Sequence, residues 1–310
     1  MTASQKAWSP VRWAKNGGVQ IAYDRFLAAP ADGEPLLLLM GLGTSRRWWP
    51  DGFCAALAAH GFAVARYDQR DAGESTHLQD APARNPIAAL TGKRREIYTA
   101  EDMADDAIAV MDALGWESAH LLGASLGGAA AQRVALRHPD RVRTLTSSSA
   151  VPGDMAGVRT LRYIRLGTLA KLARLKFPDT REGDVEAGVA LARMLASPAR
   201  PFDEQAVRAR IESSPDPGVR DQKAQSRQIG ARWHGPPVSS LRTPTLVLHG
   251  EDDPLIRPAA ARRIATTVAG SSLAILPGVG HDLPEHAWPD VADRVRRHAG
   301  LGQRRTAHRA

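Results

Sequence analysis

The segment Gly123-Ala-Ser-Leu-Gly127 constrains the possible folds of this chain more than any other segment. A short, largely apolar run, Ala119 to Leu122, precedes it and suits a buried strand, and a helix-forming run from Ala129 to Leu136 follows it. A strand that turns sharply into a helix holds the central side chain, Ser125, in a strained and exposed position, and the two glycines leave room for that turn. The spacing therefore predicts a serine nucleophile at the edge of a sheet.

Two later segments supply candidates for the base and the acid that such a serine needs, because its hydroxyl is a poor nucleophile at neutral pH. A buried strand at 246–250 ends in Glu251-Asp252-Asp253, and a further strand at 273–276 runs into a glycine-rich loop that ends at His281. Since the carboxyl ends of parallel strands lie at one edge of a sheet, Ser125, one of these acids and His281 are predicted to converge on one crevice.

The choice of acid is ambiguous at the level of sequence. We select Asp253, because the turn after Gly250 should point the third residue inward, and Asp252 stays open as the alternative. His281 is selected as the base over His286, five residues further on, because it follows the glycine loop directly. The order serine, acid, histidine then matches one known arrangement of a catalytic triad.

An oxyanion hole needs two backbone N–H groups aimed at the oxygen on which negative charge develops. One is expected from Leu126, the residue after the nucleophile, at the positive end of a helix. The other is expected from Leu42, in the loop after the apolar strand 36–40. Trp48 and Trp49, just beyond that loop, are candidates for lining the substrate pocket.

A dense polar turn follows the strand at 62–68, and it contains Asp68, Arg70 and Asp71. A catalytic role for one of these carboxylates is possible in principle. We favour a structural role, in which Arg70 ties nearby loops together by paired hydrogen bonds.

Strands and helices alternate along the first half of the chain and again near its end, which predicts a mostly parallel, doubly wound α/β sheet. A half-exposed edge strand is expected at 18–23, and a central strand at 36–40. We assign residues 1–150 and 236–310 to this core. Other expected strands lie at 62–68 and 142–146, and expected helices at 51–60, 99–114, 258–268 and 288–297.

Residues 151–235 interrupt the alternation, because no clear strand pattern occurs there. Leucines and isoleucines between 161 and 175 share one helical face, and 186–195 and 203–211 also favour helices. We therefore predict a helical cap inserted into the core. A membrane-surface helix at 161–177 is the alternative, but an apolar cap face that packs over a pocket is the more common use of such a pattern.

Composition limits the range of partners. The chain of 310 residues carries a formal net charge of +8, but it has no basic patch with interleaved aromatic residues, so we expect no nucleic-acid partner. We expect no membrane association, because the longest apolar stretch is too short to span a bilayer. Cys54 is the single cysteine, and residues 1–18 lack the apolar core of a secretory signal, which favours the cytoplasm. The oligomeric state stays open.

These motifs together resemble the α/β-hydrolase superfamily over nearly the whole chain. Within it, Leu39-Met40-Gly41, Trp49-Pro50, residues 67–76 and the loop 277–281 are similar to the aclacinomycin methylesterase group. That group removes a methyl ester from polyketide anthracyclines. The resemblance implies Ser125 as nucleophile, His281 as base and Asp253 as orienting acid. It also implies oxyanion donors at Leu42 and Leu126 and requires no metal or cofactor.

The sequence therefore predicts a serine hydrolase that cleaves a carboxylic ester, with a methyl ester of a bulky, polyketide-like small molecule as the expected substrate. A lactonase, a carbon–carbon bond hydrolase or a prolyl-aminopeptidase-like enzyme would use the same triad. A non-catalytic ligand-binding protein on the same fold is the alternative from another class, and an intact triad argues against it.

Overall fold

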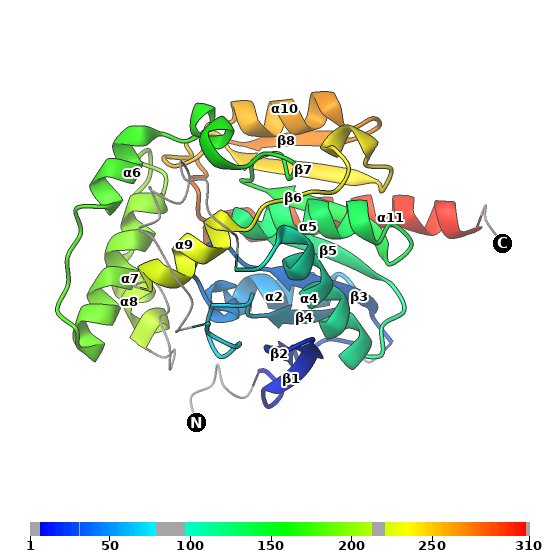
Figure 1. Ribbon diagram of the computed structural model, residues 1–310, viewed down its shortest axis with the longest axis horizontal. Coiled ribbons are helices and arrows are strands. Elements are labelled where there is room, and N and C mark those ends of the chain that lie inside the picture. The colour runs from blue at the N-terminus through cyan, green and yellow to red at the C-terminus, as the bar shows by residue number, and fades with distance from the viewer. Residues whose placement is uncertain (1–6, 31, 79–96, 213–220, 308–310) are drawn as a thin grey trace.

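The computed structural model describes residues 7–30, 32–78, 97–212 and 221–307. Within them, one eight-stranded sheet has the order β1-β2-β4-β3-β5-β6-β7-β8 (Figure 1). β2 is antiparallel to both β1 and β4, and the other neighbours are parallel, so the predicted mostly parallel α/β sheet is confirmed. The strands are β1 (Arg12–Asn16), β2 (Val19–Arg25), β3 (Glu34–Leu39), β4 (Phe62–Tyr67), β5 (Ala119–Ala124), β6 (Val142–Ser148), β7 (Thr245–Gly250) and β8 (Ser272–Leu276).

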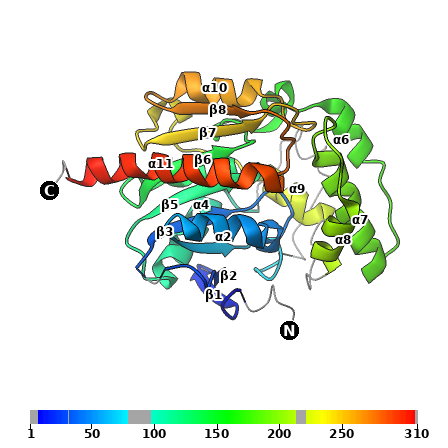
Figure 2. The same cartoon turned by 180° about the vertical axis from the view of Figure 1, so that it is seen from behind.

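Helices cover both faces of the sheet, because the central strands are apolar on both sides. One core cluster joins the sheet to α4, α5 and α10, and a second joins the opposite face to α2 and α11. Figure 2 shows α2 and α11 together on the face opposite to α4 and α5. The bounds are α2 (Asp51–Ala59), α4 (Ala100–Ala113), α5 (Leu126–Arg137), α10 (Ala259–Thr267) and α11 (Trp288–Ala307).

The ends of α4 illustrate how local sequence sets these elements. Thr99 accepts a hydrogen bond from the backbone N–H of Asp102, and the Asp102 side chain accepts one from the N–H of Thr99, which is a complete capping box. Gly115 follows the helix with φ of 72°, a conformation that favours glycine. The start and stop predicted for this helix are confirmed.

The first strands differ from the expectation. The predicted edge strand at 18–23 is β2, which lies between β1 and β4 and is largely buried. The true edge is β1, which the sequence analysis missed. Only Ala14 of its five residues is buried, and Trp13 is 51% exposed, so the strand has almost no alternation of apolar and polar residues.

The described residues between 151 and 235 include a group of helices at one end of the sheet. Figure 1 shows α6, α7 and α8 side by side there, with α9 between them and the core helices. The elements are η2 (Gly157–Arg162), α6 (Leu166–Leu172), α7 (Arg181–Leu195), α8 (Glu204–Glu212) and α9 (Gln222–Gly230). α9 was not expected from the sequence. No strand occurs in the described part of this segment, although Ile164 forms an isolated bridge with Ile256.

That bridge explains why the helical face predicted over 161–175 is broken. Between η2 and α6, the backbone of Arg165 donates to the carbonyl of Leu255 at 2.8 Å, and Tyr163 accepts from the N–H of Arg257 at 2.8 Å. The chain therefore leaves the helical path to bond with the loop after β7. No helix in the described part of the chain is long and apolar enough to cross a bilayer.

Candidate active site

Ser125 occupies the sharp turn between β5 and α5, with φ of 54° and ψ of −121°. The two flanking glycines are required by close backbone contacts. A Cβ on Gly123 would lie 2.1 Å from the carbonyl oxygen of Gly127, and a Cβ on Gly127 would lie 2.1 Å from that of Leu39. The turn is therefore packed against the end of β3, and the strained position predicted for Ser125 is confirmed.

Asp253 and His281 meet at the ends of β7 and β8. His281 Nδ1 lies 2.7 Å from Asp253 Oδ2, and the Asp253 side chain is fully buried. Its other oxygen, Oδ1, accepts hydrogen bonds from the backbone N–H groups of Leu255 and Ile256, at 2.8 and 2.7 Å. The carboxylate is thus fixed in the orientation in which it contacts the imidazole.

The pKa values of this pair move in opposite directions. Burial alone would raise the pKa of Asp253, but the charge of His281 and hydrogen bonds from His249 and His281 outweigh it and lower that pKa. Burial alone would lower the pKa of His281, but the charge of Asp253 and their hydrogen bond raise it above its ordinary value of 6.5. The arrangement therefore favours a charged acid beside an imidazole of increased basicity.

Asp252 points elsewhere, so the geometry distinguishes the two candidate acids. Its Oδ2 accepts a hydrogen bond from Ser197 Oγ at 2.7 Å, just beyond the end of α7. His249 is buried at the end of β7, where its Nε2 lies 2.9 Å from the carbonyl oxygen of Ile256 and 3.3 Å from Asp253 Oδ2. Both imidazoles therefore lie against the same oxygen of Asp253.

One cavity of ≈ 2260 Å³ is lined by both Ser125 and His281, and by Leu42 and Leu126. Within the described residues, no hydrogen bond joins the Ser125 hydroxyl to the imidazole, which is common in enzymes without substrate. The competing His286 is exposed and contacts Arg200. Trp48 and Trp49 also line the cavity, and so do apolar residues of the 151–235 segment, including Leu169, Leu172, Leu175, Phe177 and Leu191.

A family model that describes the alpha/beta hydrolase fold matches residues 34–286, which contain all of the elements above from β3 to β8. The chain belongs to the α/β-hydrolase family. The expectation of fold and family from the sequence motifs is confirmed.

Two curated relatives of this α/β-hydrolase cover most of its length. Rhodomycin D methylesterase DnrP of Streptomyces peucetius is 30% identical over 298 residues, which is 89% of this chain and 93% of the relative. Rhodomycin D methylesterase DauP of Streptomyces sp. (strain C5) is 32% identical over 277 residues, or 82% and 87%. These matches confirm the resemblance to anthracycline methylesterases and support the hydrolysis of an ester by this chain.

Solved structures agree on the fold. The esterase RhEst1 of Rhodococcus sp. ECU1013 superposes with a TM-score of 0.67 at 20% sequence identity, covering 95% of this chain and 99% of that one.

In the described part of this α/β-hydrolase, no group of three or more His, Cys, Asp or Glu side chains is arranged to hold a metal ion.

The loop that carries Leu42 lies directly beside Ser125. A Cβ on Gly41 would be 3.3 Å from the Ser125 Cβ. The N–H of Gly43 donates to Gln228 Oε1 at 2.9 Å, and Gln228 Nε2 donates to the carbonyl of Arg70 at 2.8 Å. The sequence analysis missed this brace, because Gln228 is 185 residues from Gly43 and has no local motif.

The polar turn after β4 acts as an anchor for its surroundings. Arg70 forms two hydrogen bonds with Asp106 on α4, at 2.7 Å each, and Asp68 accepts from the backbone N–H of Arg46 at 2.6 Å. Asp71 pairs through both oxygens with Arg227 on α9, at 2.8 and 2.7 Å. These contacts support the structural role predicted for the turn, and the Asp71 pair attaches α9 to the core.

Proposed function

We propose that this α/β-hydrolase is a serine esterase that acts on a methyl ester of a bulky, largely apolar, polyketide-like molecule and proceeds through an acyl-enzyme. The observation that carries the proposal is the 2.7 Å contact between Asp253 Oδ2 and His281 Nδ1, with His281 and Ser125 lining one cavity. Because Asp253 Oδ2 accepts a hydrogen bond from a protonated Nδ1, His281 Nε2 is left as the free acceptor.

The chemistry follows from that tautomer. His281 Nε2 takes the hydroxyl proton of Ser125 as Oγ attacks the ester carbonyl, and the resulting oxyanion accepts hydrogen bonds from the Leu42 and Leu126 amides. Leu126 is the first residue of α5, where the N–H has no acceptor within the helix. The imidazolium then protonates the departing alcohol, which leaves an acyl group on Ser125.

Water completes the cycle. His281 Nε2 removes a proton from a water molecule as the water oxygen attacks the acyl carbon, and the second oxyanion uses the same two amides. Collapse of this intermediate returns the proton to Ser125 Oγ and releases the carboxylic acid. Asp253 stays ionised throughout and stabilises the imidazolium, in keeping with its lowered pKa.

The substrate class is inferred from the cavity and from the relatives. Residues 151–235 contribute much of the apolar lining, so we propose that they form a cap that shapes the pocket. A cavity of ≈ 2260 Å³ exceeds the roughly 300–1,000 Å³ usual for small-molecule sites and suits a large ligand. The names of the two relatives, both rhodomycin D methylesterases, support a methyl ester on a polyketide-like skeleton.

The proposal is tested first with a serine-reactive phosphonate probe. We expect labelling of the wild-type protein and of Ser148→Ala, but not of Ser125→Ala. Ser148 is a matched control because it also lines the cavity, at the end of the neighbouring strand β6. Labelling of Ser125→Ala, or no labelling of any of the three proteins, would contradict the serine mechanism.

The base is tested by turnover of p-nitrophenyl acetate. We expect a fall of at least about 10³-fold in His281→Ala, as for the loss of a triad member in other hydrolases. The control is His286→Ala, since His286 is exposed beside Arg200. Unchanged turnover in His281→Ala would overturn the assignment of the base. The substrate class is tested separately, by hydrolysis of a panel of polyketide methyl esters.

A further inference from the structure

Arg133 lies on the same side of α5 as the nucleophile Ser125, further along the helix. Ser125, Ala129 and Arg133 are spaced four residues apart, so they share one side of the helix, and all three line the cavity. A helical rise of 1.5 Å per residue separates the Cα atoms of Ser125 and Arg133 by about 12 Å. The side chain contacts Gly153, which packs beside Ala129, one helical turn nearer to Ser125: a Cβ on Gly153 would lie 3.1 Å from the Ala129 carbonyl oxygen.

The Arg133 guanidinium is buried and held in place. Only 4% of the residue is exposed, and its Nε donates to the carbonyl of Gly153 at 2.8 Å. Gly153 is itself fixed, because its N–H donates to Gln132 Oε1 at 2.8 Å. In contrast, Nη1 is buried without a hydrogen-bond partner among the residues that the structure describes. Such an unsatisfied buried donor needs an explanation.

The positive charge of Arg133 is also left without a direct counter-ion, since it forms no ion pair within the described ranges. The carboxylates that act on it from a distance are Glu101 and Asp154. Neither forms an ion pair with it: Glu101 Oε1 accepts from the N–H of His234 at 2.6 Å while Oε2 lies 3.5 Å from His234 Nδ1, and Asp154 accepts from the N–H of Val238 at 3.1 Å. Burial lowers the pKa of Arg133 to about 10, so the side chain is still charged at neutral pH.

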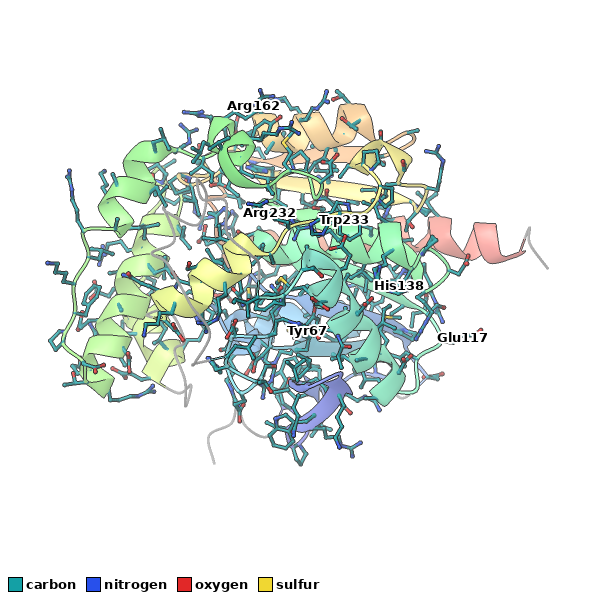
Figure 3. The ribbon with its side chains drawn as sticks, in the orientation of Figure 1. Tyr67, Glu117, His138, Arg162, Arg232 and Trp233 are labelled. Atoms are coloured by element: carbon teal, nitrogen blue, oxygen red, sulfur yellow. The ribbon has the colours of Figure 1, made fainter. Side chains whose placement is uncertain are left out.

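The segment after α9 is bonded to the start of α4, the helix that packs beside α5. Arg232 accepts a backbone hydrogen bond from Ala100, at the start of α4, at 2.9 Å. Figure 3 shows Arg232 and Trp233 on the same side of the sheet as α4 and α5. A buried cation with one donor unused is costly unless a ligand completes it.

We propose that Arg133 is a subsite for a carboxylate group on the acyl part of the ester substrate. The planar guanidinium matches a carboxylate in shape and charge, and pairing would satisfy both Nη1 and the buried charge. The natural substrate is then a half-ester, in which one carboxyl is esterified and reacts at Ser125 while a free carboxylate binds Arg133. This inference rests on the proposed ester hydrolysis at Ser125, and its test separates the two.

The test compares two series of methyl esters of equal chain length. One contains the monomethyl esters of dicarboxylic acids from succinate to sebacate, and the other the methyl esters of the corresponding monocarboxylic acids. In the wild-type protein, the ratio of kcat/KM between charged and neutral esters should pass through a maximum at one chain length. In Arg133→Met, that ratio should fall about 10-fold or more, as expected for a hydrogen bond to a charged group.

Two further variants keep the result interpretable. Arg263→Met removes an exposed arginine on α10 and should leave the ratio at its wild-type value. Arg133→Lys keeps the charge without the planar fork, so an intermediate ratio is expected. If circular dichroism shows that Arg133→Met does not fold, the proposal is tested by the ratio in Arg133→Lys and by the dependence of the wild-type ratio on chain length. A wild-type ratio without a maximum, or one unchanged in either Arg133 variant, would overturn the proposal.

Binding without turnover separates this proposal from ester hydrolysis. Isothermal titration calorimetry on Ser125→Ala and on Ser125→Ala/Arg133→Met would use monomethyl suberate and methyl octanoate. We expect the second mutation to weaken binding of the charged ester about 10-fold more than binding of the neutral one. If no ester is turned over by the wild type, the proposed function fails, yet this titration still decides on Arg133. Equal losses for both esters would refute the subsite.

Discussion

Gln228 on α9 accepts a hydrogen bond from the backbone N–H of Gly43, with 2.9 Å between the nitrogen and Oε1. The same side chain donates to the carbonyl of Arg70, so its amide joins two loops at the end of the sheet. The residue before Gly43 is Leu42, the proposed oxyanion donor. A side chain from the 151–235 segment therefore holds the residue next to the proposed donor, and an oxyanion donor acts only from a fixed position.

The first prediction concerns this brace. Gln228→Ala should lower kcat with little change in KM, because the looser loop affects the oxyanion more than the bound ester. The loss should stay below the roughly 10²–10³-fold typical of removing an oxyanion donor itself. Gln222→Ala, the same substitution at the exposed first residue of α9, is the control. A rise in KM alone, or the same small effect in both variants, would argue against a positioning role for Gln228.

The second prediction concerns pH. Since Asp253 raises the pKa of His281 above 6.5, the acidic limb of kcat/KM should have its midpoint above that value, because only neutral imidazole accepts the serine proton. In Asp253→Asn the charge is lost while burial remains, so the midpoint should move to lower pH and kcat should fall about 10⁴-fold. The control is Asp252→Asn, whose side chain bonds Ser197 instead. A midpoint that does not move in Asp253→Asn would contradict the role of its charge.

The same pair also contributes to stability in a defined pH range. The lowered pKa of Asp253 gives stability that is complete above the ordinary value of 3.8 and is lost as the pH falls through the folded-state pKa. The raised pKa of His281 gives stability that is complete below 6.5 and is lost as the pH rises through its folded-state pKa. Urea unfolding should therefore show the largest difference between wild type and Asp253→Asn from about pH 4 to 6.5.

The third prediction concerns the attachment of α9. The side chains of Arg227 and Asp71 are 2% and 0% exposed, so Arg227→Met leaves a buried carboxylate without its counter-ion. This should cost about 3–5 kcal/mol in the free energy of unfolding, as measured in urea by circular dichroism. Adding Asp71→Asn removes the unpaired negative charge, and asparagine tolerates the φ of 63° at this position. The double variant should be more stable than Arg227→Met, and an equal or larger loss would contradict the argument.

The sequence predicted the parts of the site whose signals are local. Ser125 sits in a glycine-flanked turn between a strand and a helix, and His281 follows a glycine loop, so both positions follow from neighbouring residues. Asp253 was preferred to its neighbour Asp252 from the turn after Gly250, and the structure adds the contacts that distinguish the two side chains. There, the direction of each side chain depends on contacts with Ser197 and His281.

The features that were missed depend on long-range contacts or on weak patterns. β1 has a single buried residue, Ala14, so its place at the edge of the sheet comes from pairing with β2 and not from its own sequence. The break between η2 and α6 arises from backbone bonds of Arg165 with a loop some 90 residues later, to Leu255. Gln228 likewise acts on Gly43 across most of the chain, and no local motif marks such a partner.

The last prediction concerns strain at the nucleophile. Ser125 has φ of 54°, where a residue with a Cβ costs of order 1–3 kcal/mol, whereas glycine adopts such angles freely. Ser125→Gly relieves the strain but gains freedom in the unfolded chain, which costs about 0.5–1 kcal/mol. Ser125→Gly should thus be about 1 kcal/mol more stable than Ser125→Ala in urea unfolding, with both variants inactive. Ser148 is the control, because it is not among the residues with positive φ. There, Ser148→Gly should be less stable than Ser148→Ala. If the glycine variant were the more stable one at both positions, stored strain at Ser125 would be excluded.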